Sequence, residues 1–130
     1  MTTFTQKSKT ILLIIDPQVD FHPGGSLGIP GADEDSARIS ELITTRGDEI
    51  DEIYVTLDSH HRLHIAHGVC WTNKAGESPP PFTLIKNADV EAGTWVPRNA
   101  ALLEYAKFYT RALEDKGRFV MCIWPEHCLM

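Results

Sequence analysis

The chain has 130 residues, of which 42% are hydrophobic, an ordinary content for one small domain with a packed core. Its formal net charge of −6 argues against nucleic acid or an anionic membrane as the main partner, because both repel an acidic surface. Three cysteines without framework spacing, and no secretory signal at the start, predict free thiols in a reducing, cytoplasmic setting.

The first half of the chain predicts two strands separated by a helix. Residues 11–15 are all Ile or Leu, a continuous apolar run typical of a parallel strand that is covered on both faces. Asp33 or Asp35 is expected to cap a helix that runs to about Thr45. Residues 53–57 then form a second strand, rich in β-branched side chains. This order predicts a right-handed βαβ unit.

The second half is less regular. A long stretch from His60 to Arg98 contains a triple proline, and a loop of this length is typically functional or an insertion with short elements of its own. Asn99 is expected to cap a helix that ends near Lys116, and residues 119–124 form a third strand. Together the elements predict an α/β fold, a partial three-layer α/β/α, Rossmann-like parallel sheet of about three strands.

Ionisable residues follow each predicted strand. Ligands of open α/β sheets bind beyond the carboxyl ends of the strands, so we expect these groups to meet in one crevice. If the strand geometry persists, the side chains of Asp58 and His60 point the same way, and His127 supplies a third ligand. Two imidazoles and a carboxylate suit zinc, iron or manganese. The residues concerned are Asp16, Asp58, His60, Glu126 and His127.

Each of these residues also has a simpler explanation. Asp58 could cap a loop while His60 faces solvent. Glu126 either orients its neighbour His127, acts as a base, or is a solvated carboxylate. Three further histidines in the same loop are extra ligands, hydrogen-bond partners of the ligands, or simply exposed side chains. They are His61, His64 and His67.

The three cysteines are expected to be structural rather than nucleophilic. Cys122 lies inside the third predicted strand and is expected in the core. Cys70 lies in the irregular stretch, and Cys128 adjoins His127, but adjacency in sequence does not make a catalytic pair. A reactive thiolate needs a cationic or helix-terminal setting, and the sequence places none beside these residues.

Three segments carry motifs whose order and spacing are specific. They are Ile14-Ile15-Asp16-Pro17-Gln18-Val19-Asp20-Phe21, Asp58-Ser59-His60 and Trp124-Pro125-Glu126-His127-Cys128. Together they resemble the isochorismatase-like cysteine hydrolases, and within them the nicotinamidases, whose motifs are Asp-x-Gln-x-Asp-Phe, Asp-x-His and Trp-Pro-x-His-Cys. The resemblance implies one incomplete hydrolase domain over residues 1–130, equivalent to about the first half of a family member, with an irregular insertion at about 61–98.

The resemblance also implies roles for single residues. Asp16 corresponds to the aspartate of an Asp-Lys-Cys triad, and Asp58, His60 and His127 correspond to the ligands of a divalent metal, usually zinc. In the nicotinamidases this metal helps to bind the pyridine nitrogen, and the cysteine thiolate attacks the carboxamide, releasing ammonia through an acyl-enzyme. The implied substrate is therefore a small-molecule amide such as nicotinamide.

Two departures from the family pattern shape the functional expectation. The family's lysine and nucleophilic cysteine lie downstream of Trp-Pro-x-His-Cys, where this chain has only Leu129 and Met130. The 67 positions between His60 and His127 (127 − 60) resemble a long-insertion subgroup, whose substrate can differ. We therefore expect the isolated chain to be inactive as a hydrolase, and to act as a homo-oligomer or with a missing C-terminal half.

Other functions stay open at this point. The chain could be a non-catalytic metal-binding or assembly remnant of such a hydrolase. Two histidines and a carboxylate also fit a non-haem iron oxygenase, but a jelly-roll oxygenase needs many alternating strands and this sequence shows βαβ spacing. The apolar run over residues 11–15 would form an exposed sheet edge if a neighbouring strand were missing, and such an edge favours dimerisation or poor solubility.

Overall fold

The computed structural model of the chain describes residues 8–130. Its contacts divide the chain into two compact units, Met1–Asp58 and Ser59–Met130, which we describe separately. The mixed α/β class predicted from the sequence is confirmed, with helices and a small parallel sheet. The assignment of residues 1–130 to one incomplete hydrolase domain stays a prediction.

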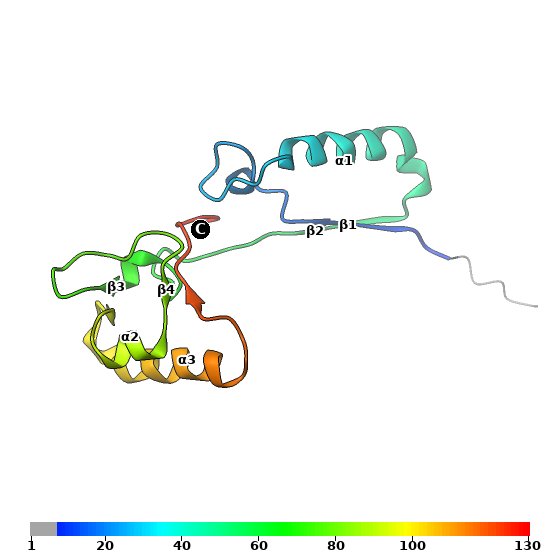
Figure 1. The fold of residues 1–130 in the computed structure, drawn as a ribbon. Coiled ribbons are helices and arrows are strands. Elements are labelled where there is room, and N and C mark those ends of the chain that lie inside the picture. Colours follow the sequence, from blue (N-terminus) through cyan, green and yellow to red (C-terminus); the bar gives the residue numbers. More distant parts are fainter. Residues whose placement is uncertain (1–7) are drawn as a thin grey trace, which may run out of the picture. The chain divides into compact units, whose positions relative to one another are not determined.

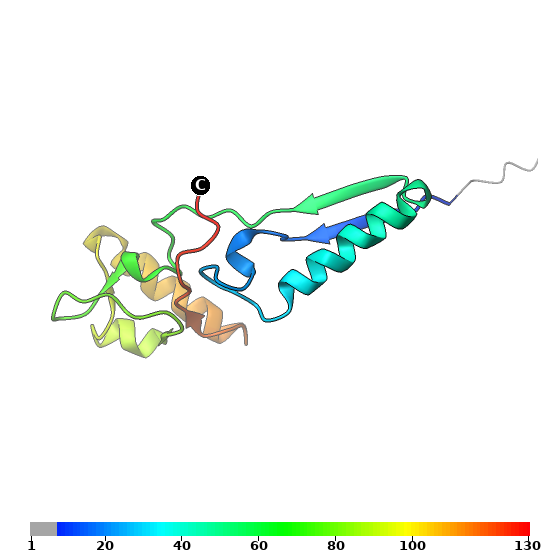
Figure 2. The same ribbon diagram turned by 90° about the horizontal axis from the view of Figure 1, so that it is seen from above.

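The N-terminal unit has the predicted strand, helix, strand order (Figure 1). Strand β1 (Ile11–Ile15) pairs in parallel with β2 (Glu52–Thr56), in a register that sets Ile11 opposite Glu52. Helix α1 (Ala32–Arg46) connects them and lies along one face of the pair, and Figure 2 shows the two strands side by side. Two short 3-10 helices, η1 (Val19–Phe21) and η2 (Gly47–Glu49), complete the unit.

The start of α1 differs from the prediction. The residue before the helix is Gly31, whose φ of 86° is left-handed, and no side chain caps the first turn. Asp33 and Asp35 lie within that first turn instead, where their charges interact favourably with the positive end of the helix dipole. The prediction that one of them is the capping residue is therefore wrong, although the helix itself is confirmed.

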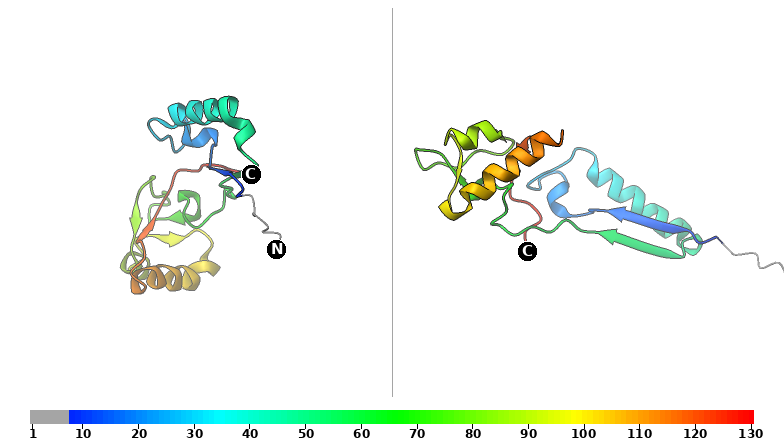
Figure 3. Two further views of the ribbon diagram at one scale, coloured as in Figure 1. Left: turned by 90° about the vertical axis from the view of Figure 1, so that its right-hand side faces the viewer. Right: turned by 90° about the horizontal axis from the view of Figure 1, so that it is seen from below.

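The C-terminal unit is built from short elements (Figure 3). Strand β3 (Trp71–Thr72) pairs antiparallel with β5 (Val96–Pro97), and β4 (Leu84–Ile85) pairs antiparallel with β6 (Met121–Cys122). The helical elements of the unit are η3 (Gly68–Cys70), α2 (Asn87–Glu91), η4 (Ala100–Leu102) and α3 (Leu103–Asp115). The stretch predicted to be irregular therefore does contain short elements of its own.

The third predicted strand forms, but not in the expected sheet. It shortens to β6, and its partner is the antiparallel β4. The next residue, Ile123, continues this pairing, because its N–H donates to Thr83 O at 2.9 Å and its carbonyl accepts from Phe82 N at 2.5 Å. Across residues 8–130 the structure has two-stranded sheets only, so the three-stranded parallel sheet is not found in this part of the chain and stays a prediction. The pairing of β6 with β4 sets Met121 opposite Ile85, and both side chains are buried in the same core.

The predicted helix after Asn99 is confirmed with a tighter first turn. The side chain of Asn99 accepts a hydrogen bond from Ala101 N at 3.1 Å, which is the expected cap. One 3-10 turn, η4, precedes α3, and Gly117 follows the helix with a left-handed φ of 59°. Ala106, on this helix, is buried.

The main hydrophobic core lies inside the C-terminal unit. It joins β3, β4, α2, α3 and β6, so the predicted insertion supplies much of a core rather than a surface loop. None of the helices in residues 8–130 combines the length and the apolar character needed to cross a membrane. The core residues are Trp71, Ile85, Val90, Ala106, Met121 and Ile123.

The Ile85→Ala substitution tests this core. Ile85 is 0% exposed, so removing its side chain leaves a cavity, and we expect the free energy of unfolding to fall by about 2–5 kcal/mol. Leu84→Ala is the matched control, because Leu84 is 56% exposed in the same strand and should change stability by less than about 1 kcal/mol. Urea titration followed by tryptophan fluorescence measures both, and equal losses would contradict the assigned core.

Candidate metal centre

The last segment of the chain runs beside the loop that follows the second predicted strand. His60 pairs with Leu129 and His67 pairs with Trp124, both as parallel bridges, so His127 lies between two fixed points. All of these residues belong to the C-terminal unit. The backbone hydrogen bonds of this pairing are His60 N to Cys128 O at 3.0 Å, Trp124 N to Ala66 O at 2.7 Å and Met130 N to His60 O at 3.1 Å.

This pairing brings three imidazoles together. One ring nitrogen each of His60, His67 and His127 lies within 4.8 Å of the other two. Three nitrogens bound to one tetrahedral zinc ion are about 3.3 Å apart, given Zn–N bonds of about 2.0–2.1 Å. A small inward movement of the side chains therefore suffices to hold an ion. His67 is 0% and His127 is 6% exposed, so most of this cluster is shielded from solvent.

Backbone carbonyls orient two of the three rings. His67 Nδ1 lies 3.1 Å from Arg62 O, and His127 Nδ1 lies 2.8 Å from Pro125 O. A carbonyl oxygen only accepts, so Nδ1 donates in both rings, and in the neutral tautomer that this selects the lone pair is on Nε2. Histidine ligands of metals are usually fixed by such an outer hydrogen bond.

The Nε2 atom of His67 is buried and has no hydrogen-bond partner among the described protein atoms. Leaving a buried polar atom without a partner costs free energy, and such atoms are rare in folded proteins. A metal ion bound to the lone pair would satisfy it. The donor set, the shielding and this orphaned atom together fit a divalent ion.

An ion pair links the two segments that carry the clustered histidines. Arg62 Nε donates to Glu126 Oε2 at 3.0 Å. Arg62 also provides the carbonyl that orients His67, and Glu126 immediately precedes His127. Because Arg62 is largely exposed, solvent screens this pair and its contribution to stability is small. The contact found for Glu126 is therefore with Arg62, which supports the His127 segment indirectly.

The three loop histidines that the sequence left open have different positions. His67 joins the cluster, whereas the exposed His61 does not. His64 packs against two of the clustered histidines, with its ring centre 5.0 Å from that of His60 and 5.2 Å from that of His67. Its Nδ1 accepts a hydrogen bond from Ala66 N at 3.2 Å, so the proton pattern of this ring differs from that of His67.

The predicted ligand Asp58 ends the N-terminal unit. Gln18 fixes its backbone, because the side-chain amide donates to Asp58 O at 2.8 Å and the side-chain oxygen accepts from Asp58 N at 2.6 Å. The Asp-x-Gln segment is thus joined to the Asp-x-His segment. The role of Asp58 as a metal ligand stays a prediction.

Asp16, the predicted catalytic aspartate, directly follows β1. Its carboxylate accepts a hydrogen bond from Thr56 Oγ1 at 2.6 Å, and its N–H donates to Thr56 O at 3.2 Å. Its φ of 50° is left-handed, a conformation that costs energy in residues other than glycine and that gathers at functional sites. Beside it lies a cavity of about 320 Å³ that also contacts His22, Asp35 and Ser36. The catalytic role of Asp16 stays a prediction.

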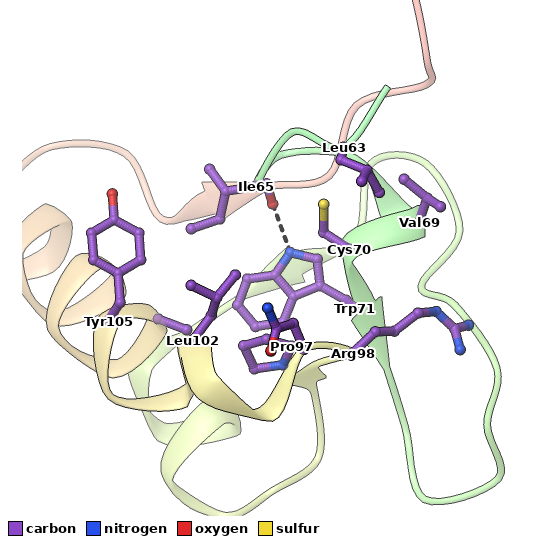
Figure 4. Close-up of a pocket in the computed structure, with 11 residues that line it drawn as sticks. Leu63, Ile65, Val69, Cys70, Trp71, Pro97, Arg98, Leu102 and Tyr105 are labelled. Atoms are coloured by element: carbon purple, nitrogen blue, oxygen red, sulfur yellow. Dashed lines mark hydrogen bonds between the residues drawn. The ribbon is translucent and has the colours of Figure 1, made fainter. Parts of the chain in front are cut away.

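A second cavity lies in the C-terminal unit, with a volume of about 420 Å³. Its walls are almost wholly apolar, and Trp71 is fixed there by a hydrogen bond from its indole N–H to Ile65 O at 2.6 Å (Figure 4). The Arg98 guanidinium points away from the other labelled side chains and donates to Ser78 Oγ at 2.9 Å. Cys70 also lines this cavity, and burial, with a smaller effect of the Glu126 charge, raises the pKa of its thiol.

The raised pKa of Cys70 predicts slow alkylation. The thiolate is the reactive form and burial disfavours it, so the rate with iodoacetamide should rise only at a higher pH than for an ordinary cysteine. Mass spectrometry of the labelled peptides separates Cys70 from the other two cysteines. The same chain in urea is the control, because unfolding should return Cys70 to ordinary behaviour. Rapid labelling of folded Cys70 at neutral pH would contradict this account.

Comparisons of the chain with protein-family models, curated proteins and solved structures gave no significant match. The resemblance to the isochorismatase-like hydrolases therefore depends on the three motifs alone. What the structure contributes is a group of three histidines, His60, His67 and His127, within metal-binding distance of one another.

Proposed function

We propose that this chain binds a divalent metal ion, zinc by preference, through His60, His67 and His127. The observation that supports the proposal is the convergence of three ring nitrogens within 4.8 Å in a largely buried cluster. Neutral imidazoles suit zinc, whereas magnesium and calcium prefer oxygen ligands. Iron and manganese rank behind zinc for this set.

Three protein ligands leave a position open on a tetrahedral ion, as in catalytic zinc sites. An ion held there would lower the pKa of a bound water and would polarise a substrate carbonyl. The residues of the chain hold and orient the ion: Arg62 O and Pro125 O fix the proton positions of two ligands. If Asp58 of the neighbouring Asp-x-His motif also binds the ion, as the resemblance implies, a water or substrate would need a fifth coordination position, which zinc can provide.

We further propose that the metal site belongs to an amide hydrolase of the isochorismatase-like kind, with a truncated Rossmann-like fold and a substrate such as nicotinamide. The three motifs support this assignment, and the strained position of Asp16, held by Thr56, suits a triad aspartate. None of the 130 residues matches the triad lysine or the nucleophilic cysteine of the family. In this proposal another polypeptide segment supplies both.

A non-catalytic metal-binding role is the second candidate. One observation favours it: the raised pKa of Cys70 leaves this thiol protonated and poorly nucleophilic. Cys128, which matches the non-nucleophilic cysteine of the third motif, is buried. The two candidates share the metal and differ in whether a completed protein cleaves an amide bond.

The His67→Ala substitution tests the metal site. We expect zinc affinity to fall by at least about 100-fold. Loss of a residue that only hydrogen-bonds to a ligand already lowers metal affinity by up to about 100-fold, and loss of the ligand itself should cost no less. His61→Ala is the matched control, because His61 lies in the same loop but is exposed. Titration against a chromophoric chelator measures the affinity. Zinc should also raise the melting temperature of the unsubstituted chain and the control, but not of His67→Ala. Unchanged affinity in His67→Ala would overturn the ligand assignment.

An ammonia-release assay on nicotinamide tests the hydrolase assignment. We expect no release by the zinc-loaded 130-residue chain, because it has no match to the triad lysine and nucleophile. Adding a segment that carries both should produce release that Asp16→Ala abolishes. If the isolated chain releases ammonia in an Asp16-dependent way, the claim that it needs another segment is wrong. If the completed protein binds zinc but releases none, the non-catalytic role is favoured.

A further inference from the structure

A serine and a histidine meet at the start of α1, and neither belongs to the proposed metal site. Ser36 Oγ lies 2.7 Å from His22 Nε2, and His22 Nδ1 lies 2.8 Å from Gln18 O. The carbonyl oxygen only accepts, so Nδ1 donates, and in the neutral tautomer that this selects Nε2 accepts the hydroxyl proton of Ser36. All three residues belong to the N-terminal unit. A nucleophile hydrogen-bonded to a base, with the base oriented by a third group, is the arrangement that activates a serine for covalent catalysis.

Backbone contacts hold the histidine and its orienting carbonyl in place. His22 O accepts a hydrogen bond from Gly25 N at 2.8 Å. A Cβ on Gly28 would lie 2.8 Å from the same oxygen, so the loop closes tightly on this residue. The side chain of Gln18 is hydrogen-bonded to both backbone groups of Asp58, which fixes the residue that supplies the carbonyl. The fold therefore positions the base in advance, as a functional pair requires.

The pair lines a cavity of about 320 Å³ in the same unit. This volume is at the lower end of the range of about 300–1,000 Å³ that is typical of small-molecule sites. Ser36 and His22 are both half-buried, so a small molecule in the cavity reaches the hydroxyl. Apolar side chains there suit a short acyl chain or an aromatic leaving group, whereas two carboxylates repel an anionic substrate. The apolar residues include Ile15, Phe21, Ile29 and Ile39, and the acidic residues are Asp16 and Asp35.

We propose that Ser36 is a nucleophile that His22 activates, and that it accepts an acyl group from a small, uncharged, activated ester. In this step Ser36 Oγ bonds to the carbonyl carbon of the ester while the hydroxyl proton moves to His22 Nε2. The bond between that carbon and the alcohol oxygen then breaks, and the alcohol leaves with the proton. The products are acyl-Ser36 and the free alcohol, so the step balances without another reactant.

An activated ester is the class of acyl donor that suits this pair. The group that orients His22 is a carbonyl dipole, which stabilises a protonated imidazole less than the aspartate of a full catalytic triad does. An ester with a good leaving group needs less activation than an amide. The pair therefore acts on esters rather than on the carboxamide of the proposed hydrolase, and this inference does not depend on the proposed metal function.

Incubation of the chain with 4-nitrophenyl acetate, followed by mass mapping of its peptides, tests the proposal. We expect acetyl-Ser36 to form, and its rate of formation to fall by at least about 100-fold in His22→Gln, because positioned general bases contribute about 10²–10⁴-fold. Glutamine keeps a hydrogen-bond donor and an acceptor but is not a base. Ser40→Ala is the matched control, because Ser40 is exposed one turn further along α1 and should not affect Ser36. Circular dichroism checks that each variant is folded.

A purely structural role of this hydrogen bond would give different results. If Ser36 of the unsubstituted chain is acetylated no faster than Ser40, the bond only joins the loop to the helix and the proposal is wrong. Equal acetylation of Ser36 in the unsubstituted chain and in folded His22→Gln would also overturn it, because the histidine would then not act as a base. A chelator is present throughout, so the result is independent of zinc binding and the two proposals fail separately.

Discussion

The C-terminal unit depends on the pairing of its last segment with the loop that begins at His60. That pairing buries Ile123 in the core and places His127 beside His60 and His67. The same few hydrogen bonds therefore serve both packing and chemistry. Cys128 shows the constraint, because its φ of 47° is left-handed directly after a ligand. A chain that turns so sharply at this point is held by its neighbours rather than by local preference.

The buried nitrogen of His67 would couple the proposed metal binding to folding. Without an ion, the lone pair of His67 Nε2 is buried away from water and accepts no hydrogen bond, which destabilises the folded unit. With an ion, the same burial strengthens the interaction, because solvent no longer competes for it. The free energy of binding then appears as stability of the folded unit, as in other small metal-binding domains. Gly68 supports this arrangement: a Cβ there would lie 2.6 Å from Pro79 O, so only glycine lets the chain pass so closely after His67.

The sequence predicts those elements of the fold that short-range patterns determine. The apolar run of β1, the spacing in α1 and the Asn99 cap are each encoded within a few residues, and each is found. It also predicts His60 and His127 as neighbours, because motifs at strand ends converge. It does not single out His67, since the backbone of that residue pairs with Trp124, 57 positions away (124 − 67), and no local pattern predicts this pairing. For the same reason an apolar run over residues 119–124 indicates a strand but not its partner, and β4 is a partner that no local signal identifies.

The hydrogen bonds of Gln18 give a physical reason for a glutamine at this position of the first motif. Its side chain must donate to one backbone group of Asp58 and accept from another, and an amide is the side chain that does both across so short a distance. Glutamate offers no donor when ionised, and leucine offers neither group. The loop after β2 therefore leaves the sheet from a position that the loop after β1 fixes. Residues 40 positions apart (58 − 18) are joined, so Asp58 and Asp16 are presented from one end of the βαβ unit.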